Sequence, residues 1–371
     1  MMSMPSTHNQ WPLWLALSFV PRLAIAQKLA LVEHFSLDQL FELPASVLKS
    51  LSLSDQQINA IRIPNKRRID WIIETSVKRN DLIISFSDAR YPASLKEIPN
   101  PPLVLFTKGN HALLQQPQIA IVGSRSATMS ALNSARGFAR DIVQRHVVVT
   151  SGMAIGIDSA AHQGALQAQG HTIAVVATGL DITYPKRNTS LEQAILANQG
   201  LVVSEFPPGS KPLPGCFPRR NRIITGLCLG TLVVEAQLAS GSMISAQAAL
   251  EQNREVFAMP GSINNPQAKG CHSLLKQGAK LVETVQDIFD ELDIGQRPAD
   301  IASSEKKCIK TQQQDLCIDS LLSSVDYETT SVDTVVSRSK LPIEQVMTRL
   351  MALELKGLVA AVPGGFIKKN N

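Results

Sequence analysis

Charged residues are scarce in this chain. They make up 18% of its 371 residues, against about 25% in ordinary soluble proteins. Hydrophobic residues make up 44%, which is enough for sizeable cores and argues against a disordered chain. The cysteines include no Cys-x-x-Cys spacing and stand at Cys216, Cys228, Cys271, Cys308 and Cys317. We therefore expect reduced thiols in a cytoplasmic protein, and neither a disulfide framework nor a four-cysteine zinc site.

The sequence also lacks an uninterrupted apolar run long enough to cross a membrane. The most apolar stretch, Trp11–Val32, is broken by Pro12, Pro21, Arg22 and Lys28, and no Lys or Arg precedes it. This stretch predicts buried amphipathic helices rather than a signal peptide or a membrane span. We expect no membrane partner.

Several nucleotide-binding and catalytic motifs are absent. The chain has no Walker A sequence, no Gly-x-Gly-x-x-Gly turn, no Gly-x-Ser-x-Gly elbow and no His-Glu-x-x-His helix. His162 does not stand at metal-ligand spacing, and His272 next to Cys271 is a weak pair because consecutive residues rarely ligate one ion. We expect no metal and no cofactor.

Three structured zones are predicted along the chain. Periodic Leu, Ile and Val predict an N-terminal helical domain at 1–80, with short helices that end near Phe35, Leu43 and Leu51. At 81–290, short apolar runs alternate with helical stretches, and most runs precede a glycine. The runs are Ile119–Val122, Val147–Val149, Ile173–Val176, Leu201–Val203, Leu232–Val234 and Val256–Ala258. Such alternation predicts an α/β fold whose parallel sheet is covered on both faces and binds ligands at one edge.

A polar linker is predicted at 291–312, followed by a winged helix-turn-helix domain at 313–371. Its last helix is predicted to start at Pro342 and to stop at Gly357. One face of this helix is predicted to carry Ile343, Val346, Met347, Leu350 and Met351. A hairpin with its turn at 363–365 follows, which completes the pattern of a winged helix.

Two segments carry candidate ligand-binding residues. Gly123-Ser124-Arg125 follows a predicted strand and is expected to open a helix, whose free N–H groups and dipole suit a phosphate. Arg125 adds a cation that can bind such an anion through two hydrogen bonds. The alternative is a plain turn with an exposed Arg. Likewise, Lys186 and Arg187 after Tyr184-Pro185 bring cations to the same edge or are incidental surface charges.

The segment Phe206–Val234 contains no Asp or Glu but four cations, Lys211, Arg219, Arg220 and Arg222. Its prolines predict a stiff, non-helical loop. A rigid basic loop at the ligand edge suits a polyanion, and Phe206, Phe217 and Tyr184 could stack on unpaired bases. The alternative is a solvated loop with Phe217 buried. Glu235 is expected to be structural, because no second carboxylate or His is paired with it by sequence.

These blocks resemble the DNA-processing protein A family (DprA, also called Smf). The resemblance covers about half the chain in order: Ile121–Arg125, Ser151-Gly152 with Gly156–His162, Gly179–Asp181 with Tyr184-Pro185, Ser204-Glu205, Phe217-Pro218 with Arg220–Ile224, Val233–Ala236, Ser240–Ser242 and Pro260-Gly261.

The resemblance implies a protein without catalytic activity that binds single-stranded DNA, protects incoming DNA in natural transformation and loads the recombinase RecA onto it. It implies an extended Rossmann-like core that forms a homodimer, with an N-terminal sterile-alpha-motif-like domain and a C-terminal winged helix. The implied DNA-binding residues are Gly123, Ser124, Arg125, Lys186, Lys211, Phe217, Arg220, Asn221 and Arg222.

The chain departs from the family pattern at three points. Ile155 stands where members often have Arg, and Pro214 stands where some have Lys, so Lys211 is the candidate to replace that cation. The N-terminal zone lacks the Gly-Ile-Gly hairpin of DNA-binding helix–hairpin–helix units.

Two other functions stay open. Gly230-Thr231 with Glu235 superficially fits a nucleotide phosphoribohydrolase of the lysine-decarboxylase-like fold, although Leu227–Leu229 replaces the Pro-Gly-Gly of those enzymes. The winged helix could instead make the chain a regulator that binds duplex DNA. Its predicted recognition helix mixes Lys340, Arg349 and Lys356 with Glu344 and Glu354, and is therefore not strongly basic.

Overall fold

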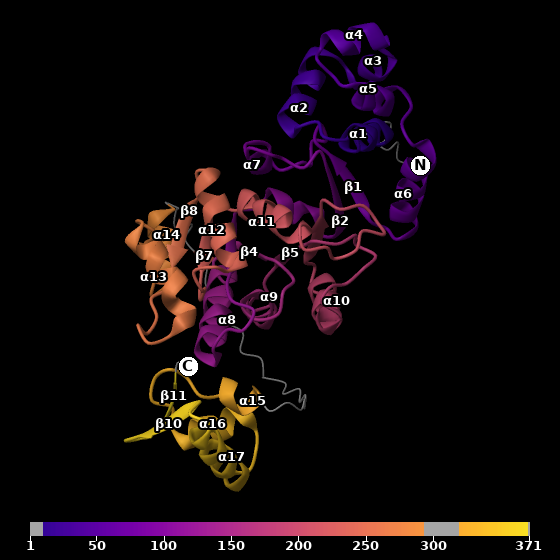
Figure 1. Cartoon of the computed structure of the whole chain (residues 1–371). Coiled ribbons are helices and arrows are strands. Elements are labelled where there is room, and N and C mark those ends of the chain that lie inside the picture. The colour runs from indigo at the N-terminus through magenta and orange to yellow at the C-terminus, as the bar shows by residue number, and fades with distance from the viewer. Residues whose placement is uncertain (1–9, 293–318, 370–371) are drawn as a thin grey trace.

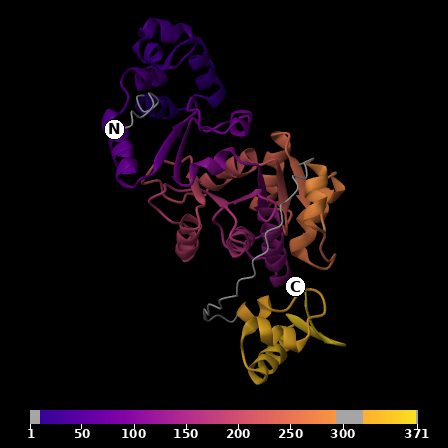
Figure 2. The same ribbon diagram turned by 180° about the vertical axis from the view of Figure 1, so that it is seen from behind.

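The computed structural model describes residues 10–292 and 319–369. Nearly all of the predicted linker, as well as Cys308 and Cys317, lies outside the described residues. The N-terminal helices pack against one end of a central α/β core, and a small C-terminal unit follows (Figures 1 and 2). Within the two described ranges, no helix is both long and apolar enough to span a bilayer.

The N-terminal helices are short because each is closed by a cap or a turn. They are α1 (Trp11–Ser18), α2 (Ile25–His34), α3 (Leu37–Glu42), α4 (Ala45–Ser50), α5 (Asp55–Arg62) and α6 (Lys66–Lys78). The Ser36 hydroxyl accepts from the Gln39 N–H at 3.3 Å, and Ser54 does the same for Gln57 at 3.4 Å. These are capping boxes, which satisfy N–H groups at a helix start. The predicted helix ends near Phe35, Leu43 and Leu51 are confirmed.

The core is a nine-stranded sheet with the order β1-β2-β6-β5-β4-β3-β7-β8-β9. Its strands are β1 (Leu82–Ser85), β2 (Val104–Gly109), β3 (Gln118–Val122), β4 (Val148–Ser151), β5 (Thr172–Val176), β6 (Leu201–Ser204), β7 (Gly230–Val233), β8 (Glu255–Ala258) and β9 (Lys280–Leu281). Strands β3 to β9 pair in parallel, and β2 pairs antiparallel with β1 and β6. The predicted α/β fold is confirmed, and β1, β2 and β9 are additions that its pattern did not reveal.

Helices cover both faces of the sheet, as Figure 1 shows. One face is packed by α8 (Met129–Val143), α9 (Ile157–Gln167) and α14 (Val285–Glu291). The other carries α7 (Ala93–Lys96), α11 (Cys216–Leu227), α12 (Gly241–Glu251) and α13 (Lys269–Lys276). The remaining elements are α10 (Thr189–Ala197) and the 3₁₀ turns η2 (His111–Gln115), η3 (Lys186–Asn188) and η4 (Pro266–Ala268). Successive residues of a strand point to opposite faces of the sheet. Because residues are apolar at successive positions of the central strands, both faces of the sheet are apolar.

The N-terminal helices share one hydrophobic core with the sheet. Trp14 and Leu17 of α1 belong to the same buried cluster as Ile83 of β1, Phe106 of β2 and Val202 of β6. The indole Nε1 of Trp14 also donates to the Ser87 hydroxyl at 2.9 Å, in the turn after β1. The antiparallel edge strands thus give the helices an apolar surface, and the two parts are continuous.

The C-terminal unit is a winged helix, as predicted. It contains α15 (Asp319–Ser323), α16 (Val332–Ser339) and α17 (Ile343–Leu355), then the hairpin β10 (Val359–Val362) and β11 (Gly365–Lys368). The predicted apolar face of α17 is partly wrong, because Ile343 and Met351 are exposed. The buried stripe runs through Val346, Leu350 and Leu353, and it packs in a core with Val335 and Phe366.

Candidate functional site

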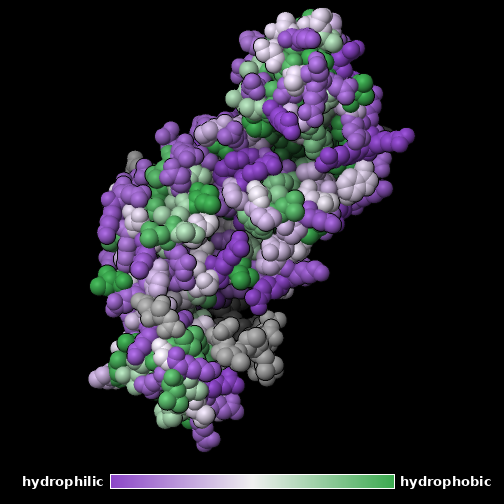
Figure 3. Space-filling view, viewed as in Figure 1, coloured by the Kyte–Doolittle hydropathy of each residue, from purple (hydrophilic) through white to green (hydrophobic). Residues whose placement is uncertain are grey.

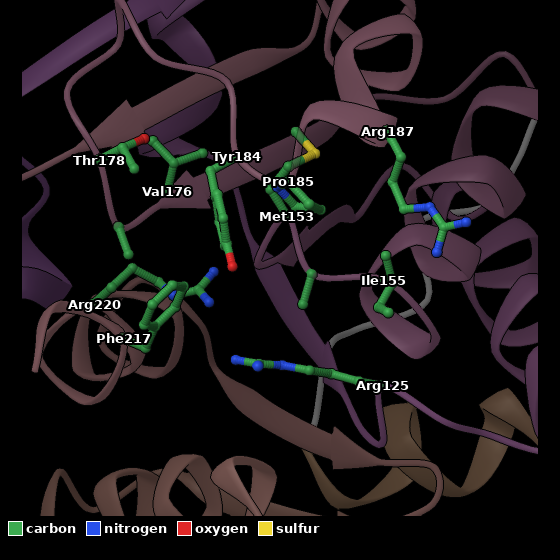
Figure 4. Close-up of a pocket in the computed structure, with 12 residues that line it drawn as sticks. Arg125, Met153, Ile155, Val176, Thr178, Tyr184, Pro185, Arg187, Phe217 and Arg220 are labelled. Carbon is green, nitrogen blue, oxygen red and sulfur yellow. The ribbon is translucent and has the colours of Figure 1, made fainter. Parts of the chain in front are cut away.

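A hollow of about 150 Å³ opens at the carboxyl ends of the central strands. Its wall combines apolar surface from Met153, Ile155 and Val176 with two aromatic rings and three arginines, and Figure 4 shows these side chains around it. A second hollow of about 360 Å³ adjoins it, since Arg125, Phe217 and Arg220 line both. The carboxyl edge of the sheet is where open α/β folds bind ligands.

The turn Gly123–Arg125 borders both hollows but differs from the prediction. It does not open a helix, because α8 begins at Met129 with Thr128 as its cap. The Ser124 N–H donates to the Glu235 carbonyl oxygen at 2.7 Å and is not free for a ligand. The Glu235 carboxylate in turn accepts from the Thr128 N–H at 2.8 Å. The chain's own carboxylate therefore occupies the anion position at the α8 N-terminus.

Glu235 has a structural environment, as predicted. It is 4% exposed, and its second oxygen accepts from the Thr128 hydroxyl at 3.1 Å and the Asn265 amide at 2.7 Å. A carboxylate with these three donors cannot approach a ribose without giving them up. This contact set disfavours the phosphoribohydrolase alternative.

A second turn, after β4, packs beneath Arg125. Gly156 has φ +85°, and a Cβ there would meet the backbone oxygens of Ser124 and Arg125. The Ile157 N–H donates to the Ser124 carbonyl oxygen at 3.2 Å. Glycine is required here by both the backbone angle and the close approach. The two turns thereby fix the position from which Arg125 projects.

Arg220 lies in the floor of the site, not on its surface. It is 5% exposed, and its Nη1 donates to the Val175 carbonyl oxygen at 2.6 Å. Asp158, 7% exposed, lies nearby. Burial raises the pKa of the Asp158 carboxyl, and the Arg220 charge opposes that shift. Both side chains pack against Gly152, since a Cβ on it would collide with both. Arg220 thus supplies a buried positive charge behind both hollows.

Two aromatic rings and Arg125 form the mouth of the smaller hollow. The ring centroids of Tyr184 and Phe217 are 5.8 Å apart at 55°. The guanidinium carbon of Arg125 lies 5.4 Å from the Phe217 centroid, and Figure 4 shows it extending toward that ring. Tyr184 is 43% exposed. Flat rings beside an exposed guanidinium can hold a planar group by stacking and an anion by charge.

The predicted acid-free basic loop is corrected at two points. Phe217 to Arg222 lie on α11, because Pro218 falls in the first turn, where the missing N–H costs nothing. Glu205, one residue before the segment, pairs with Arg222 and lies 3.5 Å from Arg219. Two of the four predicted cations therefore share one carboxylate at the end of β6, which offsets one of their two positive charges.

The remaining predicted residues are more scattered. Lys186 and Lys211 are exposed but do not line either hollow. Asn221 lines the larger one and donates to the Gly241 carbonyl oxygen at 3.2 Å. Arg187 lines the smaller hollow, although the resemblance pointed to Lys186. Two adjacent cations after Tyr184-Pro185 gave no sequence signal to choose between them.

No metal centre is found in the described parts of the chain, where no three His, Cys, Asp or Glu residues gather. His162 is a packed core residue. It is fully buried, its Nε2 lies 2.6 Å from the Gly152 carbonyl oxygen, and its Nδ1 lies 2.7 Å from the Thr172 hydroxyl. Burial lowers the pKa of His162 to about 4, so it is neutral at neutral pH.

The structure defines a Rossmann-like protein with two adjoining hollows at the carboxyl edge of its sheet. The family model described as DNA recombination-mediator protein A matches residues 82–293. The model of the DprA winged helix domain matches residues 310–365. The chain belongs to this family of DNA-processing proteins.

Similarity extends over most of the chain. It is 40% identical to Protein Smf of Escherichia coli over 326 residues, covering 87% of each chain. It is 47% identical to DNA processing protein DprA of Streptococcus pneumoniae over 209 residues, covering 56% of this chain and 73% of that one.

Two solved structures are also similar. DNA processing protein A of Streptococcus pneumoniae superposes with a TM-score of 0.67 at 37% identity, over 78% of this chain and 99% of that one. The Helicobacter pylori protein, described with a single-stranded DNA binding mode, gives 0.52 at 30% identity, over 57% and 95%.

Proposed function

We propose that this chain binds single-stranded DNA at the two adjoining hollows. A base enters the smaller hollow and packs against the exposed ring of Tyr184, and the phosphates beside it lie against Arg125 and Arg187. The observation that carries the proposal is the position of the Arg125 guanidinium over the Phe217 ring, at the mouth of a largely apolar hollow at the carboxyl edge of the sheet. The single-stranded DNA binding mode described for the Helicobacter pylori relative supports it.

The shape of the site favours a single strand over a duplex. Bases of a single strand can unstack and place their faces on aromatic rings, whereas paired bases in a duplex are covered on both sides. The aliphatic wall of Met153, Ile155 and Val176 makes no sequence-specific hydrogen bonds through its side chains. We therefore propose binding with little sequence preference, by stacking and charge.

Membership of the DNA-processing family supports a proposal for the wider role. We propose that the chain protects incoming single strands in natural transformation, delivers them to RecA in the cytoplasm and acts as a homodimer through its Rossmann-like core. We further propose that Gly123, Ser124, Lys186, Lys211 and the 220–222 block contribute to the DNA surface. We propose no catalysis, because Asp158, which lines the larger hollow, and the buried Glu235 beside the Gly123–Arg125 turn are both held by internal contacts.

One experiment tests the binding proposal. Equal-length single- and double-stranded oligonucleotides are titrated against the full chain, with molar mass measured by light scattering alongside. We expect tighter binding of the single strand and the mass of a dimer. Equal or preferred binding of the duplex, lost on deletion beyond residue 312, would instead favour the duplex-binding regulator.

Delivery to RecA has its own assay. The RecA ATPase rate is measured on a single strand coated with single-strand-binding protein, with and without this chain, and we expect the chain to raise that rate. Release of adenine from AMP at an enzymic rate that disappears in Glu235→Gln would contradict the absence of catalysis.

A further inference from the structure

One exposed aromatic ring lies outside the two hollows. Trp71 on α6 is 50% exposed, whereas the other two tryptophans, Trp11 and Trp14, are 7% and 3% exposed. A single exposed apolar side chain is ordinary on a protein surface. The surroundings of Trp71 therefore decide whether it has a role.

The first turn of α6 surrounds this ring with positive charge. Arg67 and Arg68 precede Trp71 by four and three residues and so share its side of the helix. The guanidinium of Arg68 lies 4.4 Å from the Phe19 ring centroid, while Arg67 is exposed. The acid three residues after Trp71, Glu74, lies 4.0 Å from Lys78. In full, α6 carries two acids, Asp70 and Glu74, and four cations, Lys66, Arg67, Arg68 and Lys78.

The ring is joined to the proposed DNA site by a short series of contacts. A Cβ placed on Gly209 would lie 3.3 Å from the indole of Trp71, so the loop after β6 runs against it. The next residue, Ser210, accepts through its carbonyl oxygen from the Gly179 N–H at 3.0 Å. Gly179 follows Thr178, which lines the smaller hollow. The surface from the hollow to Trp71 is thus built by neighbouring segments.

Further contacts hold α6 against the turn at Gly179–Asp181, and charged residues lie along this surface. The Arg79 Nη2 at the end of α6 donates to the Leu180 carbonyl oxygen at 2.8 Å, which ties the helix to the same turn. The exposed Lys211 stands on the loop that passes Trp71. Asp181 is the acid of this turn, and its carboxylate accepts from the Gly209 N–H at 2.9 and 3.0 Å. Figure 3 shows hydrophilic residues over much of this end of the molecule.

We propose that Trp71 is a second stacking platform for single-stranded DNA, and that a strand leaving the hollow past Lys211 lays a base on the indole and a phosphate on Arg67. This inference rests on the proposed function. Stacked bases and neighbouring cations are the two elements of sequence-tolerant single-strand binding. The N-terminal helices then take part in DNA binding without a helix–hairpin–helix motif.

Intrinsic fluorescence gives a direct test, because Trp71 is the most exposed of the three tryptophans. Oligothymidylates of about 6 and about 20 nucleotides are titrated against the full chain, the shorter being able to fill the hollow alone. We expect only the longer strand to quench the emission. Trp71→Ala should weaken binding of the longer strand by about 5- to 50-fold and leave the shorter one unchanged. Trp71→Phe should keep most of the affinity but lose the quenching.

The controls separate this inference from the proposed function. Val77→Ala removes another exposed apolar side chain of α6, 57% exposed, and should change nothing. Arg125→Ala should weaken the binding of both the shorter and the longer oligothymidylate. If Arg125→Ala weakens binding while Trp71→Ala binds the longer strand as the unchanged protein does, the Trp71 platform is refuted. If Arg125→Ala has no effect either, the proposed site is wrong. Emission that changes with protein concentration without DNA would assign Trp71 to contact between copies, and would also overturn the inference.

Discussion

Arg125→Ala should reduce both the affinity for single-stranded DNA and its dependence on salt. Arg125 is exposed at the mouth of the smaller hollow, and its guanidinium carbon lies 5.4 Å from the Phe217 ring centroid. No ion pair found among the described residues involves Arg125. Its positive charge is therefore available to a phosphate, unlike those of Arg219 and Arg222, which face Glu205.

The size of the loss follows from these contacts. A hydrogen bond to a charged group contributes about 1.5–3 kcal/mol, so loss of about 2 kcal/mol, or about 30-fold in affinity, is expected. One phosphate fewer is neutralised, so the slope of log affinity against log salt should flatten by about 0.7. The fold should be unaffected, because surface substitutions change stability by about 0.5 kcal/mol or less.

The assay is fluorescence anisotropy with a labelled oligothymidylate at several salt concentrations. Arg125→Lys keeps the charge but not the planar stack, so it should restore the slope and only part of the affinity. Arg140→Ala removes an exposed arginine that pairs with Asp141 on α8 and serves as the matched control. An unchanged slope in Arg125→Ala, with affinity within about twofold, would refute phosphate binding by Arg125.

Three further predictions concern the floor of the site and its charge. The pKa of His162 is about 4 in the folded chain, below its usual value of about 6.5. The unfolded chain therefore takes up a proton first as the pH falls, and the free energy of unfolding should drop by about 3 kcal/mol between about pH 6.5 and about pH 4. Urea unfolding should show this pH dependence, and His162→Asn should lack it. Gly152→Ala places a Cβ against the buried Arg220, so the melting temperature should drop with a loss of about 1–3 kcal/mol; an unchanged melting curve would mean that Arg220 moves freely. Glu205→Gln removes the partner of Arg219 and Arg222, so single-strand binding should tighten and become more salt-dependent while stability falls; weaker binding in a chain with unchanged circular dichroism would contradict this.

Much of the sheet could be predicted from sequence because parallel strands buried on both faces are continuous apolar runs. Ile119–Val122 and Ile173–Val176 are such runs, and β3 and β5 lie there. β9 was missed because it has only two residues, both exposed. β1 was missed because its run, Leu82–Ser85, directly follows the α6 helical pattern and is not followed by a glycine turn.

The charge of the site was harder to predict, because residues far apart in the sequence pair with one another in the fold. Glu205 lies outside the segment judged acid-free, yet the end of β6 places it against Arg219 and Arg222. The role of Glu235 at the start of α8 joins residues 107 apart in the chain. Arg125 and Phe217 were both identified from local motifs, but only the fold places one over the other.

The shared core of the N-terminal helices and the sheet has a consequence for synthesis on the ribosome. Phe106 of β2 pairs with Ser204 of β6, and Val202 completes the cluster that contains Trp14 and Leu17. These helices are translated first, but about 120 further residues, or roughly 6–25 s of elongation, must emerge before their apolar surface is covered. During that interval the nascent chain exposes an unfinished hydrophobic face, and a chaperone at the ribosomal exit would find its binding site there.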